Sequence, residues 1–494
     1  MSRKELKTPK SKFNWLLAVV LFAVSVALPF LFLHKQKAPA VAGADAEVKQ
    51  PVVPILSAAE KDKKVFATYA GSESCRECHQ EVFDKFKNSH HALAEQPIDP
   101  AKLKSFFEPA RTLPHGTQTS HASLTNNEFI FTSADVSGGQ KSFPIARVIG
   151  LEPLQQFLVA GTNGRFQTME LAIDPVRGDW FDVFGKEDRT PGEWGHWTGR
   201  GMGWNSMCAS CHNTRLRKNY DALADTYTTT MVENRVGCEA CHGPMREHNK
   251  WQRENKKSGL KDPTVTKLSR DQITDTCGSC HARRAELTGE FVPGEKFTDH
   301  FVLTIPDETD IYHADGQVRD EDYEFASFLG SKMHAAGVRC IDCHEPHSSK
   351  IRTQGNALCM TCHGAPIPPA PKIDASHSHH LAGGRGDNCV DCHMPLTTYM
   401  QRHERRDHGF TIPDPLLTKE LNIPNACNRC HTDRTAEWSN AAVDQWYGKK
   451  MDRFTRHRAQ VIAGVRADTA DSHAKLLGLV KEEKHSYWRA VENG

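Results

Sequence analysis

The sequence predicts a mainly α-helical protein with little regular structure in its core, a small β-rich insert and a short C-terminal helical segment. Three observations lead to this fold class. All sixteen cysteines belong to eight copies of one pattern, Cys-x-x-Cys-His, whose spacing places both cysteines on one face of a helical turn. Apolar residues make up only 38% of the 494 residues, which is low for a chain of this length. Residues 99–198 contain no cysteine and carry short apolar runs separated by turn residues, as strands do.

The repeated pattern is the attachment site of a c-type haem. The two thiols can form thioethers with the porphyrin vinyl groups, and the imidazole of the next residue is directed at the iron as its proximal ligand. A disulfide framework does not require a histidine after each second cysteine, a zinc ribbon does not fix one there, and a redox dithiol needs one copy rather than eight. We therefore predict eight covalently bound haems c and a multihaem cytochrome c architecture, in which porphyrin forms much of the interior.

The predicted cysteine attachments are Cys75, Cys78, Cys208, Cys211, Cys238, Cys241, Cys277, Cys280, Cys340, Cys343, Cys359, Cys362, Cys389, Cys392, Cys427 and Cys430. The predicted proximal iron ligands are His79, His212, His242, His281, His344, His363, His393 and His431.

The N-terminus has the features of an export signal, as extracytoplasmic haem attachment requires. Five basic residues within residues 1–13 precede an uncharged, almost wholly apolar stretch of 19 residues, 15–33. A signal-peptide core is usually about 7–15 residues long, whereas a membrane-spanning helix needs about 20. We predict that residues 1–33 are a retained inner-membrane anchor, with the haem region in the periplasm. The alternative is cleavage near residues 38–40, which would release a soluble periplasmic protein.

Composition divides the remainder into a tether and four segments. Residues 34–63 are rich in Ala, Pro and Val and predict the tether. The expected segments are a first haem segment at 64–98, the β-rich insert at 99–198, a seven-haem segment at 199–431 and a C-terminal helical segment at 432–494.

Two segments allow local predictions. In the insert, residues 129–131 are a strand candidate, and the turn residues 162–164 between two apolar runs predict a hairpin. In the C-terminal segment, hydrophobic periodicity predicts helices over 438–447, 453–466 and 470–481.

Each iron has a sixth coordination position, and 19 of the 27 histidines remain to fill eight such positions. A single surplus histidine is ordinarily a surface or hydrogen-bonded residue, but here the demand for ligands favours iron coordination. Methionine is the other usual axial ligand, although the supply of histidine makes bis-histidine haems the better prediction. The candidate distal ligands are His90, His91, His196, His248, His313, His334, His347, His377, His379, His380 and His408.

The sequence Cys340-Ile-Asp-Cys343-His344-Glu-Pro-His347 makes one of these candidates more specific. Proline ends the helical turn of the motif and directs His347 away from its own haem. We therefore expect His347 to bind a neighbouring iron, which would hold two haems close together.

Parts of the chain resemble known families. Residues 337–347, followed by Leu358 to His363, resemble the doubled CXXCH motif of multihaem cytochromes. A larger part, roughly residues 69 to 448, resembles exported multihaem cytochromes with a cytochrome c-554/c-prime-type haem domain. The matching stretches are 71–75, 89–91, 153–158, 196–200, 204–205, 312–317, 406–410 and 425–427. The resemblance implies a mostly helical domain with packed haem pairs and a redox role.

Two functions are consistent with the sequence. We favour an electron-transfer protein that connects a quinol-linked donor with a periplasmic or extracellular acceptor protein. The alternative is an oxidoreductase in which one open haem converts a small nitrogen or sulfur compound. All eight motifs end in an ordinary histidine, so the sequence identifies no catalytic haem. A formal net charge of +1 argues against nucleic acid as a partner.

Overall fold

The computed structural model describes residues 57–255, 258–321, 323–364, 370–374 and 376–493. The predicted membrane anchor and most of the predicted tether lie outside these ranges. Within the described ranges, no helix is both long and apolar enough to cross a membrane. The end of the predicted tether is helical, since helix α2 (Ala58–Phe66) begins at a capping box in which Ser57 and Glu60 bond each other's backbone N–H groups.

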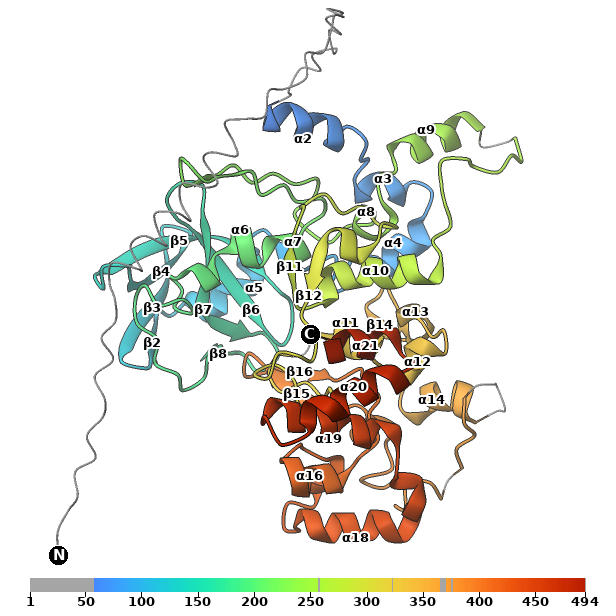
Figure 1. Ribbon diagram of the computed structural model, residues 1–494. Coiled ribbons are helices and arrows are strands. Elements are labelled where there is room, and N and C mark those ends of the chain that lie inside the picture. Colours follow the sequence, from blue (N-terminus) through green and yellow to red (C-terminus); the bar gives the residue numbers. More distant parts are fainter. Residues whose placement is uncertain (1–56, 256–257, 322, 365–369, 375, 494) are drawn as a thin grey trace, which may run out of the picture. The chain divides into compact units, whose positions relative to one another are not determined.

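The β-rich insert is confirmed, and it is a larger structure than the small insert that the sequence predicts. Seven of its strands form one antiparallel sheet in chain order from β2 to β8, and β1 pairs with β5 (Figure 1). The strands are β1 Glu95–Gln96, β2 Arg111–His115, β3 Gln118–Thr125, β4 Glu128–Ala134, β5 Gln140–Ile149, β6 Gln155–Ala160, β7 Phe166–Asp174 and β8 Asp179–Asp182. Because β1 lies before residue 99, the sheet extends into the predicted first haem segment.

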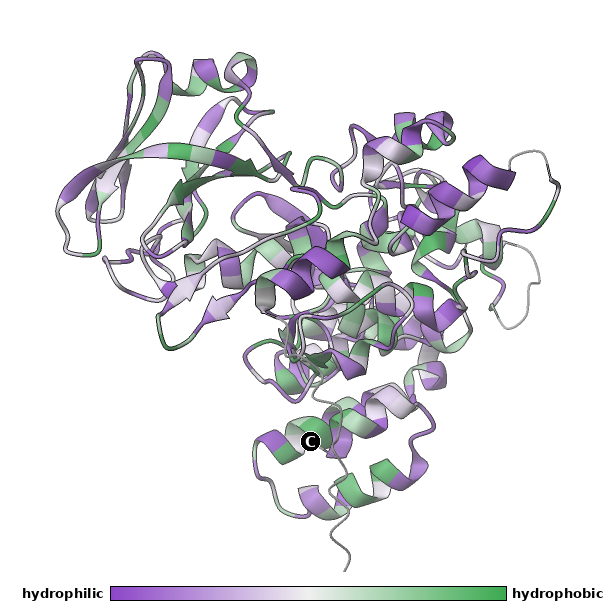
Figure 2. Ribbon diagram, turned by 90° about the horizontal axis from the view of Figure 1, so that it is seen from above, coloured by the Kyte–Doolittle hydropathy of each residue, from purple (hydrophilic) through white to green (hydrophobic). Residues whose placement is uncertain are grey.

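The sheet has its own aromatic core. Phe107, at the end of helix α5 (Pro100–Phe107), is fully buried and makes edge-to-face contacts with Phe129, Phe157 and Trp180 at centroid distances of 5.0–5.4 Å. Figure 2 shows hydrophobic and hydrophilic residues interspersed along the strands of this sheet. A core of this kind explains how the insert folds without any of the cysteine motifs.

The predicted hairpin is also confirmed, because β6 pairs with β7 across residues 161–165. Asn163 and Gly164 both adopt positive φ, at 56° and 71°. A Cβ atom at Gly164 would lie 1.9 Å from the carbonyl oxygen of Tyr227, so only glycine fits there.

The motif-bearing part of the chain is built from short helices joined by long connections (Figure 1). Each Cys-x-x-Cys-His motif lies in a helical turn or begins at one, as its spacing requires. The motif helices are α3 Ser72–Arg76, α7 Ala209–His212, α8 Glu239–His242, α10 Arg270–His281, α13 Cys340–Cys343, α14 Asn356–His363, α15 Cys389–His393 and α17 Ala426–Cys430.

The C-terminal segment is helical, as predicted, with α18 (Ala436–Tyr447), α19 (Phe454–Arg466) and α20 (Ser472–Glu482). A further helix, α21 (Ser486–Asn493), was not predicted. The core of this segment includes residues from outside it, because Ala459 and Trp488 pack in one cluster with Leu417 of helix α16 (Pro415–Leu421). The helices α16 to α21 therefore form one packed unit across the predicted boundary at residue 431.

Candidate haem sites

Six of the eight motif histidines lie opposite a second histidine. The ring centroids of these pairs are 6.1–6.3 Å apart. Two imidazoles that bind one metal from opposite sides, each through a bond of about 2 Å, have their ring centres roughly 6 Å apart. The spacing therefore fits one iron between the two rings. The pairs are His79 with His248, His242 with His347, His281 with His91, His344 with His408, His393 with His377, and His431 with His380.

Hydrogen bonds orient the rings on the distal side. Nδ1 of His248 lies 2.6 Å from a carboxylate oxygen of Asp262, and Nδ1 of His347 lies 2.9 Å from one of Glu345. Backbone carbonyls take the same role for His380, His408 and His91. An Nδ1–H that donates to oxygen leaves the Nε2 lone pair free, and this is the tautomer that binds a metal through Nε2.

The same arrangement occurs on the proximal side. Nδ1 of His212 lies 2.9 Å from the carbonyl oxygen of Ala94, Nδ1 of His363 lies 3.0 Å from that of Pro371, and Nδ1 of His393 lies 2.8 Å from that of Thr411. Nδ1 of His281 faces Glu324 at 3.4 Å. The residues present therefore fit a set of haem irons held through Nε2.

The structure places His347 as the proline at position 346 suggests. It lies opposite His242 of the third motif instead of folding back on its own motif, and the two rings are nearly parallel at 7°. Glu345, the hydrogen-bond partner of its Nδ1 atom, lies two residues before it. In the sequence Glu-Pro-His, the histidine therefore supplies the ring, the proline sets its direction and the glutamate accepts its hydrogen bond.

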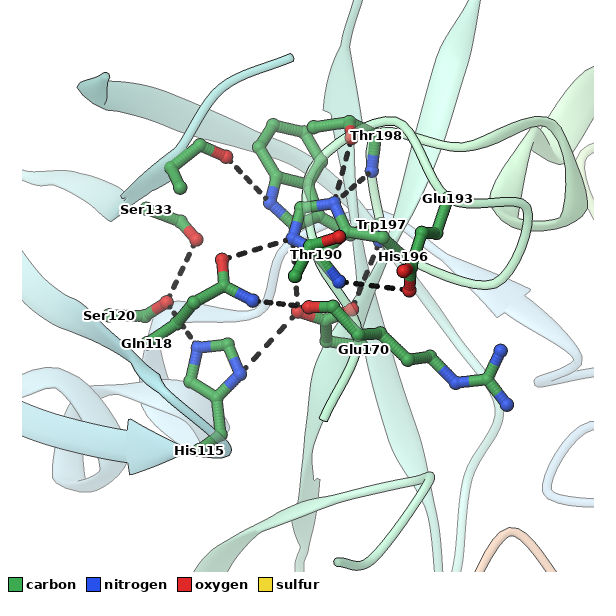
Figure 3. Close-up of polar contacts among 12 residues, drawn as sticks. His115, Gln118, Ser120, Ser133, Glu170, Thr190, Glu193, His196, Trp197 and Thr198 are labelled. Carbon is green, nitrogen blue, oxygen red and sulfur yellow. Dashed lines mark hydrogen bonds and ion pairs between the residues drawn. The ribbon is translucent and has the colours of Figure 1, made fainter. Parts of the chain in front are cut away.

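His196 is a predicted distal ligand that the structure does not bring opposite a motif histidine. It is fully buried beside the sheet in a polar cluster with His115, Gln118 and Glu170 (Figure 3). The backbone N–H of Thr198 donates to Nδ1 of His196, so the ring proton is on Nε2, which donates to the Gln118 side-chain oxygen at 3.2 Å. Both ring nitrogens are therefore engaged, and this accounts for the histidine without any iron.

Four other candidates are not brought opposite a motif histidine. His379 stacks on Trp446 at 4.3 Å, and His334 packs edge-on against Phe328 at 5.3 Å. Burial lowers the pKa of His313 to about 4 and nearby Arg319 adds to the effect, while His90 is exposed. Among the described residues, no histidine ring faces His212 or His363 at the spacing of the other six pairs.

Thiol contacts show which motifs are neighbours. Hydrogen-bond contacts join Cys75 of motif 1 to Cys238 of motif 3, and Cys277 of motif 4 to Cys340 of motif 5. Further contacts or electrostatic interactions join motifs 3 and 4, 5 and 6, 6 and 7, and 7 and 8. Motif 2 joins this series at motif 4, through Cys211 and Cys280. The motifs therefore form a series 1-3-4-5-6-7-8, with motif 2 as a side branch.

One cluster of half-buried polar and aromatic residues was not predicted from the sequence. Its members are Glu321, Tyr323, Tyr399 and Arg405, which come from two distant stretches of the chain. No local sequence pattern predicts that these residues lie together, because tyrosine and arginine occur in strands and at helix starts for many other reasons. The acceptor Glu345, by contrast, could have been found from its position just before Pro346 and His347.

Family models match three parts of the chain. Residues 74–129 and 197–243 match cytochrome c554 and c-prime, residues 333–366 match the doubled CXXCH motif, and residues 375–492 match cytochrome c552. The chain is a multihaem c-type cytochrome. The matched ranges of this cytochrome lie at the beginning, in the middle and at the end of the part of the chain that carries the cysteine motifs.

Two comparisons relate the cytochrome to individual proteins. It is 25% identical over 254 residues to the multihaem cytochrome MtrA of Shewanella baltica, which covers 48% of this chain and 56% of that protein. The chain thus matches little more than half the length of this curated relative. The crystal structure of the outer cell wall cytochrome OcwA aligns with a TM-score of 0.52 and 18% identity, covering 86% of this chain and 98% of that one. This likeness shows a common multihaem cytochrome fold.

Proposed function

We propose that the cytochrome is an octahaem electron-transfer protein that moves electrons outside the cytoplasmic membrane through closely packed, mostly bis-histidine haems. The observation that carries this proposal is the set of six opposed histidine pairs at 6.1–6.3 Å. When bound, a haem with two histidine ligands supplies one-electron transfer at low potential. Six iron positions closed on both sides by protein ligands suit the transfer of electrons rather than the binding of substrates.

The neighbour relations of the motifs support a continuous route. Every motif has a thiol contact or an electrostatic interaction with at least one other, and seven of them form the series from motif 1 to motif 8. The opposed histidines add a second connection, because His248 follows motif 3 but faces motif 1, and His347 follows motif 5 but faces motif 3. With an iron between its rings, each of these pairs would tie two motif regions together, motif 1 with the region after motif 3 and motif 3 with the region after motif 5.

We further propose that the haem region lies in the periplasm, anchored to the inner membrane through residues 1–33, with a quinol-linked donor and a periplasmic or extracellular acceptor as partners. Covalent attachment of haem c outside the cytoplasm supports the location. The similarity to MtrA and the common fold with OcwA, which is named for the outer cell wall, support a role in carrying electrons outward.

Two measurements on the purified holoprotein test this function. The mass of the denatured protein gives the number of covalently bound haems, which we expect to be eight. Electron paramagnetic resonance (EPR) of the oxidised protein should show low-spin signals for at least six of them. A haem count below eight, or mainly high-spin iron, would contradict the proposal.

A second candidate function is an oxidoreductase that acts on a small nitrogen or sulfur compound such as nitrite, hydroxylamine, sulfite or tetrathionate. One observation favours it, namely that no described histidine faces His212 or His363. An iron held by one protein ligand keeps a position at which such a compound could bind. The same EPR experiment separates the two functions, because eight low-spin haems would leave no such position.

A further inference from the structure

The β-rich sheet contacts motif 2 at both ends of the motif. On strand β7, Oγ1 of Thr168 lies 3.6 Å from Sγ of Cys208, the first cysteine. Directly before strand β1, the carbonyl oxygen of Ala94 accepts the hydrogen bond of 2.9 Å from Nδ1 of His212, the last residue of the motif. The sheet therefore touches both a haem-attachment thiol and the proximal ligand of the same haem.

Glu95, the first residue of β1, binds the chain on both sides of this motif. Its Oε2 atom accepts a hydrogen bond of 2.8 Å from Nε1 of Trp204, four residues before the motif, and one of 2.9 Å from Nδ2 of Asn213, directly after it. Nδ2 of Asn213 also donates to the carbonyl oxygen of Ala209, inside the motif, at 3.0 Å. One carboxylate oxygen thus connects the two flanks of the motif helix α7.

The other carboxylate oxygen of Glu95 forms an ion pair with Arg147 of strand β5. The guanidinium lies 4.3 Å from the ring centre of Trp204 and also donates to the side-chain oxygen of Asn234 at 3.0 Å. Glu95 and Trp204 are each 1% exposed. Burying a charge is costly unless it is paired and hydrogen-bonded, and both oxygens of Glu95 have donors. A buried pair of opposite charges therefore lies against motif 2.

Backbone pairing fixes this charge pair in place. Strand β1 pairs with β5 so that Glu95 lies opposite Ile149. Arg147, two residues along β5, is then the diagonal neighbour of Glu95 on the same face of the sheet. Because both residues belong to strands, the charge pair has a defined position relative to the motif.

We propose that Glu95 is a positioning residue for the haem of motif 2, and that its negative charge, partly balanced by Arg147, lowers the midpoint potential of this haem. The inference rests on the proposed function, because it requires a haem on Cys208 and Cys211. Oxidation of the iron adds one positive charge, so a nearby buried carboxylate favours the ferric state and a nearby guanidinium opposes it. The β-rich sheet thereby acquires a role in electron transfer although it carries no haem motif.

The place of motif 2 among the motifs gives this effect a purpose. Motif 2 joins the series at motif 4, through Cys211 and Cys280, so its haem is a side branch of the route. A branch haem of high potential would retain electrons. A lowered potential returns them to the series through motif 4.

A redox titration of the purified holoprotein, followed in the visible haem bands, tests the inference. Glu95→Gln keeps a side-chain oxygen that can accept from Trp204 and Asn213, so eight haems should remain attached. It removes the negative charge, and one of the eight one-electron components should shift to higher potential. Arg147→Gln should shift one component to lower potential, and the double variant should lie between the two single variants. Opposite signs distinguish a charge effect from simple loosening of the motif, which would move the potential in one direction for both.

Glu187→Gln is the matched control, because Glu187 is also paired with an arginine, Arg189, but has a side chain that is 65% exposed. It should leave all eight components in place. If Glu95→Gln moves no component or several, or if both single variants shift in the same direction, the inference is overturned while the electron-transfer proposal stands. If Glu95→Gln does not mature with eight haems, Arg147→Gln decides alone, and anything other than one component at lower potential overturns the inference. A haem count below eight in the wild type would overturn both proposals.

Discussion

The imidazole of His347 lies parallel to that of His242, with ring centroids 6.3 Å apart and an angle of 7° between the planes. The two residues belong to different motif regions, so one iron between them joins two parts of the chain. We expect His347→Ala to convert one low-spin haem to high spin and to leave the number of attached haems unchanged. EPR and the mass of the denatured protein measure these two properties. His379→Ala is the control, since His379 stacks on Trp446, and it should leave the spectrum unaltered.

The polar cluster inside the sheet predicts a pH dependence of stability. Burial raises the pKa of Glu170 to about 8, above its value of about 4.3 in an unfolded chain. The folded protein keeps this proton where the unfolded chain has lost it, so the contribution of Glu170 to stability is full below about pH 4 and is lost as the pH rises through about 8. Glu170→Gln cannot titrate, and its melting temperature relative to wild type should therefore rise between pH 5 and pH 8.

His115 and His196 have pKa values lowered by burial, which makes the protein more stable as the pH rises toward about 6.5. Both residues are present in the wild type and in Glu170→Gln, so their effect cancels in the difference between the two. Glu187→Gln, at a side chain that is 65% exposed, should show no pH-dependent difference. A constant difference between Glu170→Gln and wild type across this pH range would show that Glu170 is ionised in the folded state.

The aromatic core predicts which residues hold the sheet together. Phe107→Ala should cost about 3–5 kcal/mol in the unfolding free energy of the sheet, because it leaves a cavity among Phe129, Phe157 and Trp180. Denaturant unfolding followed by circular dichroism measures the loss, and the haem spectrum should be largely retained since no motif lies in the sheet. Val136→Ala, at a side chain that is 70% exposed, should change stability by less than about 0.5 kcal/mol.

The N-terminal segment makes a prediction about localisation. The full chain should sediment with the inner membrane, and replacement of residues 1–33 by a cleavable signal peptide should release a haem-loaded protein into the periplasmic fraction. Haem staining of the two fractions distinguishes the outcomes. If the product of the full sequence were found only in the soluble periplasmic fraction and lacked residues 1–33 by mass, the segment would be a cleaved signal and the anchor prediction would be wrong.

The haem-attachment residues are predicted from local spacing alone, because covalent attachment imposes a fixed Cys-x-x-Cys-His pattern, and the structure places each motif in or at a helical turn. The sequence also predicted the β6–β7 hairpin, whose turn needs the positive φ that Asn163 and Gly164 adopt. The order of the eight strands was not predicted from the sequence, because cross-strand pairing depends on residues that are distant along the chain. Helix α21 was missed because it is short and follows directly after the last predicted helix.

Counting the surplus histidines does not by itself identify which of them lie opposite a motif histidine. Six of the candidates lie opposite a motif histidine, and the proline argument for His347 identified one of them from local geometry. His196 was taken as a candidate on number alone, and its two hydrogen bonds, to Thr198 and Gln118, could be known only from the folded sheet. The cluster of Arg405 with Tyr399 and Tyr323 could likewise not be predicted from the sequence, because two distant stretches of the chain must meet to form it.

The opposed histidine pairs also bear on how this protein is made. Each pair with an iron between its rings acts as a cross-link that closes a loop of the chain. His91 emerges from the translocon before its partner motif at His281, so that loop can close as soon as the fourth motif receives its haem. His344, by contrast, must wait for His408. Maturation is therefore expected to proceed in a definite order set by which partner of each pair is secreted first.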